Sequence, residues 1–225
     1  MIVSIHQPDF FPYPGFFNKI FLSDVFVILD RAQFEFGITN RNKIITTDGS
    51  WSRISVPVKK NQKFFQINDV KINNDINWQE KNLELISKSY KNANFYNSYF
   101  SSISSIFYNN WESLMGLNLK ILKTVIEWLN IKTKILFESD LDVKGKSSKR
   151  LVNICKEVNA TTYLSGIGGK NYLDEKIFQE NKININYQEY SPISYPQINS
   201  KTFIPNLSIL DLLFNMGSKS ENFIS

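Results

Sequence analysis

Short apolar runs alternate with stretches of helical periodicity along this chain, and this pattern predicts an α/β fold. Runs rich in β-branched and other apolar residues lie at 1–5, 24–30, 133–138, 161–164 and 183–187. Continuous apolar runs are typical of strands that are buried on both faces of a parallel sheet. Because helical patterns separate several of these runs, we expect a mostly parallel central sheet with a Rossmann-like layout.

Residues 43–72 are expected to form a small β-insertion. Two strand-like runs in its first half are joined through Asp48-Gly49, which is a strong signal for a hairpin turn. A further short strand is expected from Phe64 to Ile72, where apolar residues continue.

The middle of the chain, residues 77–129, is expected to be helical. Apolar residues recur there every three or four positions in three successive stretches. A closing helix is expected at 207–216, and Gly217 is suited to end it. Residues 218–225 are expected to fray. We therefore expect one α/β domain, residues 1–225, that carries a β-insertion and a helical segment.

Composition and charge limit the function classes. The 225 residues include 42% hydrophobic residues, and the formal net charge is +5. The lysines are scattered, which is compatible with phosphorylated ligands but not with the concentrated basic stripe of a nucleic-acid binder. No apolar stretch approaches the ~20 residues needed to span a bilayer, and the start of the chain lacks the basic residues of a signal peptide. We expect no membrane insertion and a cytoplasmic protein.

One histidine and one cysteine restrict the chemistry further. A catalytic triad or a histidine-rich metal site needs more histidine than His6 alone, and a lone cysteine cannot form a zinc cluster or an internal disulfide. Cys155 lies on the apolar face of an expected helix, which favours a buried structural role. We expect no metal bound by the protein's side chains.

The stretch that follows the first strand is the strongest candidate site. His6 ends the first apolar run, prolines and a glycine prevent regular structure up to Gly15, and helical spacing begins at Phe16. In an open α/β sheet such a loop lies at the carboxyl edge, where ligands bind. The ordinary pKa of histidine suits a base that acts on an ammonium or hydroxyl group. The alternative is a histidine that only shapes the loop through a backbone hydrogen bond.

Two further segments are candidates for anion binding. Basic residues from Lys144 to Arg150 lead into an expected helix N-terminus, where free N–H groups favour phosphate. Arg150 has the planar fork that suits phosphate oxygens. Three glycines between Ser165 and Lys170 allow the backbone to approach a ligand closely. Lys59, Lys60 and Lys63 are further candidates for phosphate contact. The alternative for the basic run from Lys144 to Arg150, and for these three lysines, is a solvated surface.

Several motifs together resemble one protein family. They are His6-Gln-Pro8, Tyr13, Gly15-Phe-Phe17, Lys19, Asp30, Gln33-Phe34, Asn40-Arg-Asn42, Val56-Pro57-Val58, Tyr163-Leu-Ser-Gly166, Gly168-Gly169, Tyr195, Gln197 and the segment from Leu207 to Phe214 before Gly217. These motifs resemble those of the WbqC-like proteins of bacterial surface-polysaccharide gene clusters. The resemblance implies a role in O-antigen, lipopolysaccharide or capsule synthesis.

A second resemblance concerns the layout of the first half. A strand, a loop with histidine, proline and glycine, a helix and a second strand leading to a Gln-Phe pair are similar to the nucleotidylyl-transferase-like layout of pantothenate synthetases. Those enzymes hold ATP with a His-x-Gly-His element. The corresponding Pro14-Gly15-Phe16-Phe17 has no second histidine, so the layout matches better than the ATP motif.

The resemblances together imply a transferase that acts on a nucleotide-linked amino sugar by acyl or aminoacyl transfer, or an ATP-dependent amide ligase. ATP activation would imply magnesium. Otherwise an activated donor, such as acyl-CoA or aminoacyl-tRNA, would be used, and tRNA is the only nucleic-acid partner we expect. The alternative is a non-catalytic nucleotide-sugar-binding or scaffold protein of the same pathway.

The expected site residues fall into three groups. His6 and Gln7 are expected to act in catalysis. Phosphate binding is expected from Lys146, Arg150, Ser165, Gly166, Gly168 and Gly169. Substrate contacts are expected from Tyr13, Gly15, Lys19, Asp30, Gln33, Asn40, Arg41, Asn42, Tyr172 and Gln197.

Overall fold

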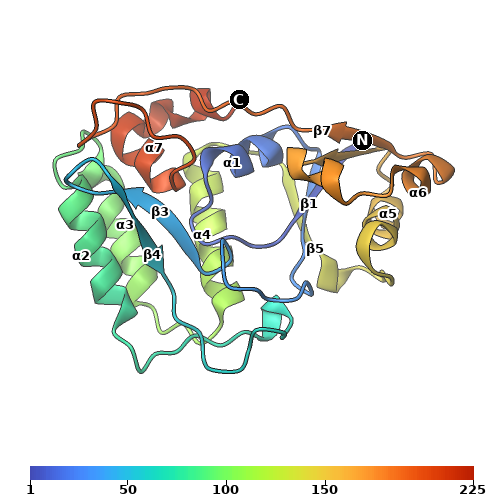
Figure 1. The fold of residues 1–225 in the computed structure, drawn as a ribbon, viewed down its shortest axis with the longest axis horizontal. Coiled ribbons are helices and arrows are strands. Elements are labelled where there is room, and N and C mark those ends of the chain that lie inside the picture. The colour runs from blue at the N-terminus through green and yellow to red at the C-terminus, as the bar shows by residue number, and fades with distance from the viewer.

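A computed structural model describes all residues, 1–225, and contains a five-stranded parallel sheet (Figure 1). Its strands are β1 (Ile2–His6), β2 (Val25–Ile28), β5 (Lys134–Phe137), β6 (Thr162–Ser165) and β7 (Asn184–Tyr187). Their spatial order is β5-β2-β1-β6-β7, and every neighbouring pair is parallel. The predicted parallel sheet is confirmed. When its five strands are renumbered in chain order, leaving out β3 and β4, their spatial order is that of the first five strands of a Rossmann fold.

Seven α-helices surround or extend this sheet. They are α1 (Pro14–Phe21), α2 (Trp78–Tyr90), α3 (Tyr96–Tyr108), α4 (Leu114–Trp128), α5 (Ser147–Glu157), α6 (Glu175–Glu180) and α7 (Ile209–Met216). Short 3₁₀ helices are η1 (Ile67–Asp69), η2 (Glu138–Asp140), η3 (Ile167–Asn171) and η4 (Gly217–Phe223). The helical middle segment is therefore confirmed as α2, α3 and α4. None of the helices has the length and hydropathy needed to cross a membrane.

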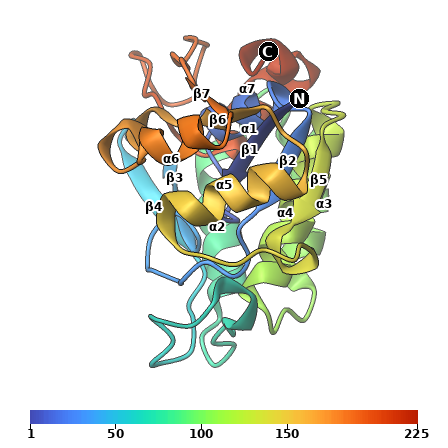
Figure 2. The same ribbon diagram turned by 90° about the vertical axis from the view of Figure 1, so that its right-hand side faces the viewer.

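The two faces of the sheet bury different helices. On β2, Phe26 and Ile28 join the larger core, which contains α1 and the helical segment. Val25 and Val27 join the smaller core, which contains α5 and α6. Side chains alternate between the faces of a strand, so every residue of β2 is buried. Figures 1 and 2 show α5 and α6 on the side of the sheet away from α2, α3 and α4.

The β-insertion is only partly as predicted. An antiparallel hairpin forms from β3 (Arg41–Ile45) and β4 (Trp51–Ser55), and its turn holds Gly49 at a φ of 81°. The strand expected from Phe64 to Ile72 is wrong, because this segment contains η1 and only isolated bridges. Its backbone N–H groups bond to separate segments: Ile67 to Ala32, and Ile72 to Glu112. No continuous partner strand is available to it.

The expectation that the last residues fray is also wrong. Residues 217–223 form η4, which packs on α7, and Ile224 is buried. The side-chain amide of Asn18 donates to the carbonyl of Ile224 at 3.0 Å, and the hydroxyl of Ser220 donates to the carbonyl of Leu212 at 3.3 Å. Apolar burial and these two bonds hold the terminus against α1 and α7.

A buried carboxylate fixes α7 to the rest of the larger core. Asp211 is fully buried and accepts hydrogen bonds from the hydroxyls of Tyr90 at 2.9 Å and Tyr195 at 2.8 Å, and from the Gln197 amide at 2.8 Å. The donors come from α2 and from the long segment between β7 and α7. Because a buried carboxylate is tolerated only when it is well bonded, this network is structural.

We predict that Asp211→Ala destabilises the protein by about 3 to 5 kcal/mol, since it leaves three buried donors without an acceptor. Thermal denaturation should show a fall in Tm of roughly 10 °C. The matched control is Asp142→Ala, because Asp142 is exposed. Equal melting temperatures for the two variants would contradict the structural role of Asp211.

Candidate functional site

The order of the strands creates a switch point between β1 and β6. The chain passes from β1 to β2 on one side, whereas β6 and β7 lie on the other side of β1. In the β1–β6 register, Ser4 lies opposite Leu164, so the segments that follow His6 and Ser165 leave the same edge side by side. Open α/β sheets bind ligands in the crevice at this position.

A cleft of about 390 Å³ opens at this edge. Four of the expected site residues line it: His6, Gln7, Arg150 and Tyr172. The remaining lining residues are mainly apolar, namely Ile5, Leu29, Ala32, Ile38, Ser147, Leu151 and Tyr163. An apolar cleft with a few convergent polar groups is the usual form of a small-molecule site.

The geometry of His6 defines its tautomer. Its Nδ1 lies 3.0 Å from the carbonyl oxygen of Gln7. Because a carbonyl only accepts, Nδ1 carries the proton and Nε2 carries the lone pair. The ring packs edge-on against Phe16 with centroids 5.1 Å apart, and no protein group hydrogen-bonds Nε2. The side chain is 30% exposed, so the imidazole offers a proton acceptor to the cleft.

Two buried charged groups lie beside His6. Asp9 and Lys19 are each only 4% exposed, and Oδ2 of Asp9 lies 3.9 Å from Nδ1 of His6. Burial raises the pKa of Asp9 to about 8 and lowers the pKa of Lys19 to about 8. Burial and the nearby Lys19 charge lower the pKa of His6 to about 3. The imidazole is therefore neutral at physiological pH.

Asp9 is a site residue that the sequence did not identify. Its Oδ1 is buried without any hydrogen-bond partner, which is rare for a carboxyl group in a folded protein. The only available signal was a carboxylate two positions after Gln7, in a loop otherwise made of prolines and aromatic residues. Its burial and its distance from His6 depend on how the loop after β1 folds, which the local sequence does not show.

The helix α1 positions Lys19 and needs Gly15. A Cβ at Gly15 would lie 2.4 Å from the ring of Tyr13 and 2.6 Å from that of Tyr190, so only glycine fits. Tyr13 and Tyr190 pack edge-on with centroids 6.2 Å apart, and burial raises the pKa of Tyr13. Tyr13 therefore lies near the buried Asp9, and none of Tyr13, Gly15 and Tyr190 lines the cleft.

Some of the residues expected to bind phosphate form hydrogen bonds within the protein, and others are exposed. Arg150 lines the cleft and donates from Nε and Nη2 to the buried carboxylate of Glu138, which leaves Nη1 without a partner in the protein. Lys146 precedes α5 and is exposed. The hydroxyl of Ser165 donates to the carbonyl of Gly166 at 3.0 Å.

The glycines of η3 differ in what surrounds them. A Cβ at Gly169 would lie 2.1 Å from the Ser165 hydroxyl oxygen, so this glycine is needed for packing. Gly166 and Gly168 have nothing within 4 Å of the same position, so their backbone is open to a ligand.

Other expected substrate contacts are bonded within the protein. The Asp30 carboxylate accepts from the N–H of Ser139 at 3.0 Å. The amide of Asn40 donates to Val56, and that of Asn42 donates to the carbonyls of Phe10 and Phe11. These side chains hold loops in place. Gln33 and Arg41 are exposed and do not line the cleft.

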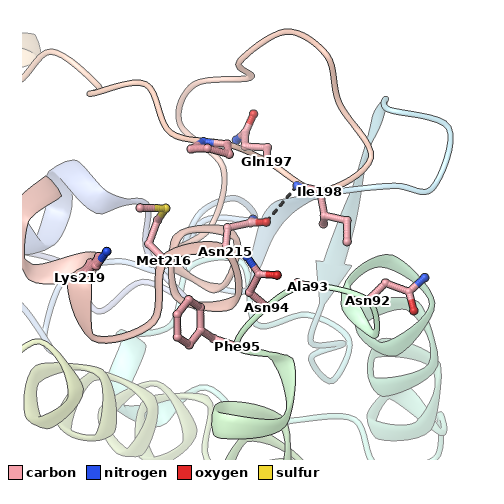
Figure 3. Close-up of a pocket in the computed structure, with 10 residues that line it drawn as sticks. Asn92, Ala93, Asn94, Phe95, Gln197, Ile198, Asn215, Met216 and Lys219 are labelled. Atoms are coloured by element: carbon pink, nitrogen blue, oxygen red, sulfur yellow. Dashed lines mark hydrogen bonds between the residues drawn. The ribbon is translucent and has the colours of Figure 1, made fainter.

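A second cavity, of about 490 Å³, lies between the α2–α3 turn and the C-terminal segment (Figure 3). Gln197 lines this cavity, away from the other expected site residues. The amide oxygen of Asn215 accepts from the N–H of Ile198 at 2.9 Å, and the Gln197 amide is committed to Asp211 and Ile204. Lys219 is the only ionisable residue that lines the second cavity. The cleft that His6 lines is therefore the stronger candidate for a functional site.

The fold is that of an α/β protein with a cleft at the switch point of a parallel sheet. The chain belongs to the WbqC-like protein family, whose profile matches residues 7–223. It is similar to an uncharacterized protein of Mycobacterium tuberculosis, Rv1507c, with 29% identity over 226 residues that cover 99% of this chain and 96% of the relative. No solved structure matches the chain. The family resemblance seen in the sequence is thus confirmed.

We predict that His6 does not titrate between pH 8 and pH 5, because its pKa is lowered to about 3. The unfolded chain, with an ordinary histidine pKa near 6.5, binds more protons in this range, so this residue favours the native state less as the pH falls below 6.5. His6 is the only histidine, so one imidazole proton resonance in the NMR spectrum reports it. A midpoint near pH 6.5 would contradict the buried environment.

Proposed function

We propose that this protein is a cytoplasmic enzyme of bacterial surface-polysaccharide synthesis that transfers an acyl or aminoacyl group to the amine of a nucleotide-linked sugar. Membership of the WbqC-like family supports the pathway, because the sequence resemblance implies it. The observation that supports the reaction is a neutral His6 that lines the cleft, with Nδ1 held by the Gln7 carbonyl and no hydrogen-bond partner in the protein for Nε2. This arrangement provides a fixed proton acceptor beside bound substrates.

The proposed reaction is a single group transfer. The acceptor nitrogen attacks the carbonyl carbon of the donor, the C–N bond forms, and the bond from carbonyl carbon to the leaving sulfur or oxygen breaks. His6 Nε2 takes the proton that the nitrogen loses and returns it to the leaving group. The activated donor is a thioester or an aminoacyl ester; if a free carboxylate is used instead, ATP must first activate it.

Asp9 supplies the counter-charge that this step requires. A histidine whose pKa is about 3 is a weak base unless a negative charge forms next to it. The Oδ2 of Asp9 is 3.9 Å from Nδ1, and its pKa of about 8 means that it ionises as the pH rises toward 8. The loss of a proton from Lys19 in the same range removes an opposing positive charge. Both changes make His6 more basic.

The nucleotide diphosphate is assigned to the α5 side of the cleft. The N-terminus of α5, Lys146, the free Nη1 of Arg150 and the open backbone at Gly166 and Gly168 are the proposed phosphate contacts. Tyr172 is 68% exposed at the rim, where it can cover a base or sugar. The glutamine side chain at position 7 has no internal hydrogen bond and is proposed to orient the acceptor.

The rival function is a nucleotide-sugar-binding or scaffold protein of the same pathway, without catalysis. One observation favours it: the low pKa of His6 suits a hydrogen-bond acceptor for a sugar hydroxyl as well as it suits a base. Both functions use the same cleft and the same ligand. They differ in one respect: substitution of His6 should abolish turnover in an enzyme, whereas a binding protein has no turnover to lose.

We predict that His6→Gln lowers kcat at least 100-fold, since it removes the proton acceptor, and that Asp9→Asn lowers kcat about tenfold. For the unmodified protein kcat should rise with pH through about 8, where Asp9 ionises and Lys19 loses its proton, and Asp9→Asn should reduce this rise to the part that Lys19 contributes. The assay uses UDP- and dTDP-linked amino sugars with acetyl-CoA, aminoacyl-tRNA, or a carboxylate with ATP and magnesium.

Thermal-shift titration with the same nucleotide sugars separates binding from chemistry. Both variants should keep the ligand-induced rise in Tm, and Asp142→Asn serves as a matched carboxylate control. Undiminished turnover in His6→Gln would exclude the role of the imidazole. Ligand binding without turnover against every donor class would favour the binding protein.

A further inference from the structure

We propose that this protein docks on anionic membrane surfaces through an exposed apolar patch beside the cleft. The patch, here called the Phe64 patch, consists of Phe36, Ile38, Phe64 and Phe65. Their side chains are 54%, 53%, 71% and 48% exposed, respectively. Large apolar side chains that gather on a surface usually mark a contact with a partner or a membrane.

Backbone pairing brings the two loops of the patch together. The N–H of Phe34 donates to the carbonyl of Phe65 at 2.8 Å, and an antiparallel bridge joins Gln33 to Gln66. The ring of Phe36 packs edge-on against the buried Phe34 with centroids 5.3 Å apart. The loop of residues 59–66 lies at the end of the molecule opposite α7 (Figure 1).

The exposure of Phe64 is built into the loop. The buried amide of Gln62 donates to the carbonyls of Lys59 at 3.1 Å and Lys71 at 2.9 Å, and accepts from the N–H of Lys71 at 2.8 Å. The N–H of Phe65 then bonds to the carbonyl of Gln62 at 3.0 Å. With Gln62 turned inward and bonded on both sides, the next aromatic residues are directed outward.

Three unpaired lysines lie in the same loop as Phe64 and Phe65. Lys59, Lys60 and Lys63 are exposed, and none of them forms an ion pair. The ammonium of Lys63 lies 5.3 Å from the centroid of the Phe64 ring. In these loops the only carboxylate is Glu35. Apolar side chains that enter the acyl region, with lysines at the level of lipid phosphates, are the two components of interfacial binding.

The chemistry of the patch favours a lipid surface over a nucleic acid. The four side chains of the patch carry no polar atom, so they gain most when they leave water for hydrocarbon. Ile38 belongs to both the patch and the cleft lining, so a membrane bound there lies next to the cleft mouth. This inference does not depend on the transfer reaction, and its test measures membrane binding alone.

The test is co-sedimentation of the full chain with phosphatidylglycerol vesicles and with phosphatidylcholine vesicles. We expect binding to the anionic vesicles that weakens with salt, and little binding to the zwitterionic ones. Lys59→Glu/Lys60→Glu/Lys63→Glu should lower the partition coefficient at least about 100-fold, at roughly fivefold for each lysine lost. Phe36→Ser/Phe64→Ser/Phe65→Ser should lower it about 100-fold or more.

Two matched controls come from exposed residues elsewhere. Lys81→Glu/Lys88→Glu/Lys91→Glu makes the same change of charge on α2 and at the residue that follows it, and Tyr108→Ser removes an aromatic side chain that is 64% exposed on α3. Both should bind vesicles like the unmodified protein. The proposal is overturned if the control triple variant loses as much binding as the patch variant, or if the lysine variant binds normally. It is also overturned if single-stranded RNA, and not vesicles, binds the patch.

Discussion

The central strand β1 is the constraint on which the rest of the structure depends. It is hydrogen-bonded to β2 on one side and to β6 on the other, and its three inner residues are buried. Pro8 follows almost at once and has no N–H to continue a ladder. The chain must therefore leave the sheet directly after His6. Because the strand order reverses at β1, this exit point is also the ligand-binding edge of the fold.

The burial of Asp9 and Lys19 next to β1 is costly for stability. Asp9 and Lys19 are withdrawn from water without a close ion pair, and the Oδ1 of Asp9 has no partner. Buried ionic groups of this kind usually add little to stability, and apolar replacements of similar volume often do as well. A group that folding alone does not favour is better explained by its effect on the neighbouring imidazole, whose pKa is lowered by burial and by the Lys19 charge.

The sequence predicted the parts of the fold that depend on local patterns. Apolar runs gave the five strands, and the Asp48-Gly49 turn gave the hairpin. It also predicted His6, Gln7, Arg150 and Tyr172 as site residues, and all four line the same cleft. Their roles there stay predictions.

What the sequence did not predict depends on distant partners. The segment from Phe64 to Ile72 has apolar residues of a strand but no neighbouring strand to pair with. The chain terminus is ordered by an amide on α1. The amides of Asn40, Asn42 and Gln197 resemble ligand contacts in sequence, but their partners are backbone or carboxylate groups far along the chain. Spacing alone does not encode such contacts.

One loop links the imidazole, the cleft and the exposed patch into a rigid unit. The N–H of Phe10, in the segment that follows His6, donates to the carbonyl of Ile38 at 2.9 Å. The buried Asn118 on α4 donates to the carbonyls of both Pro8 and Thr39, at 3.1 and 2.8 Å. One side chain thus ties the loop after His6 and the loop of the patch to the same helix. A surface that binds the patch would therefore contact a loop that is bonded to the same helix as the segment after His6.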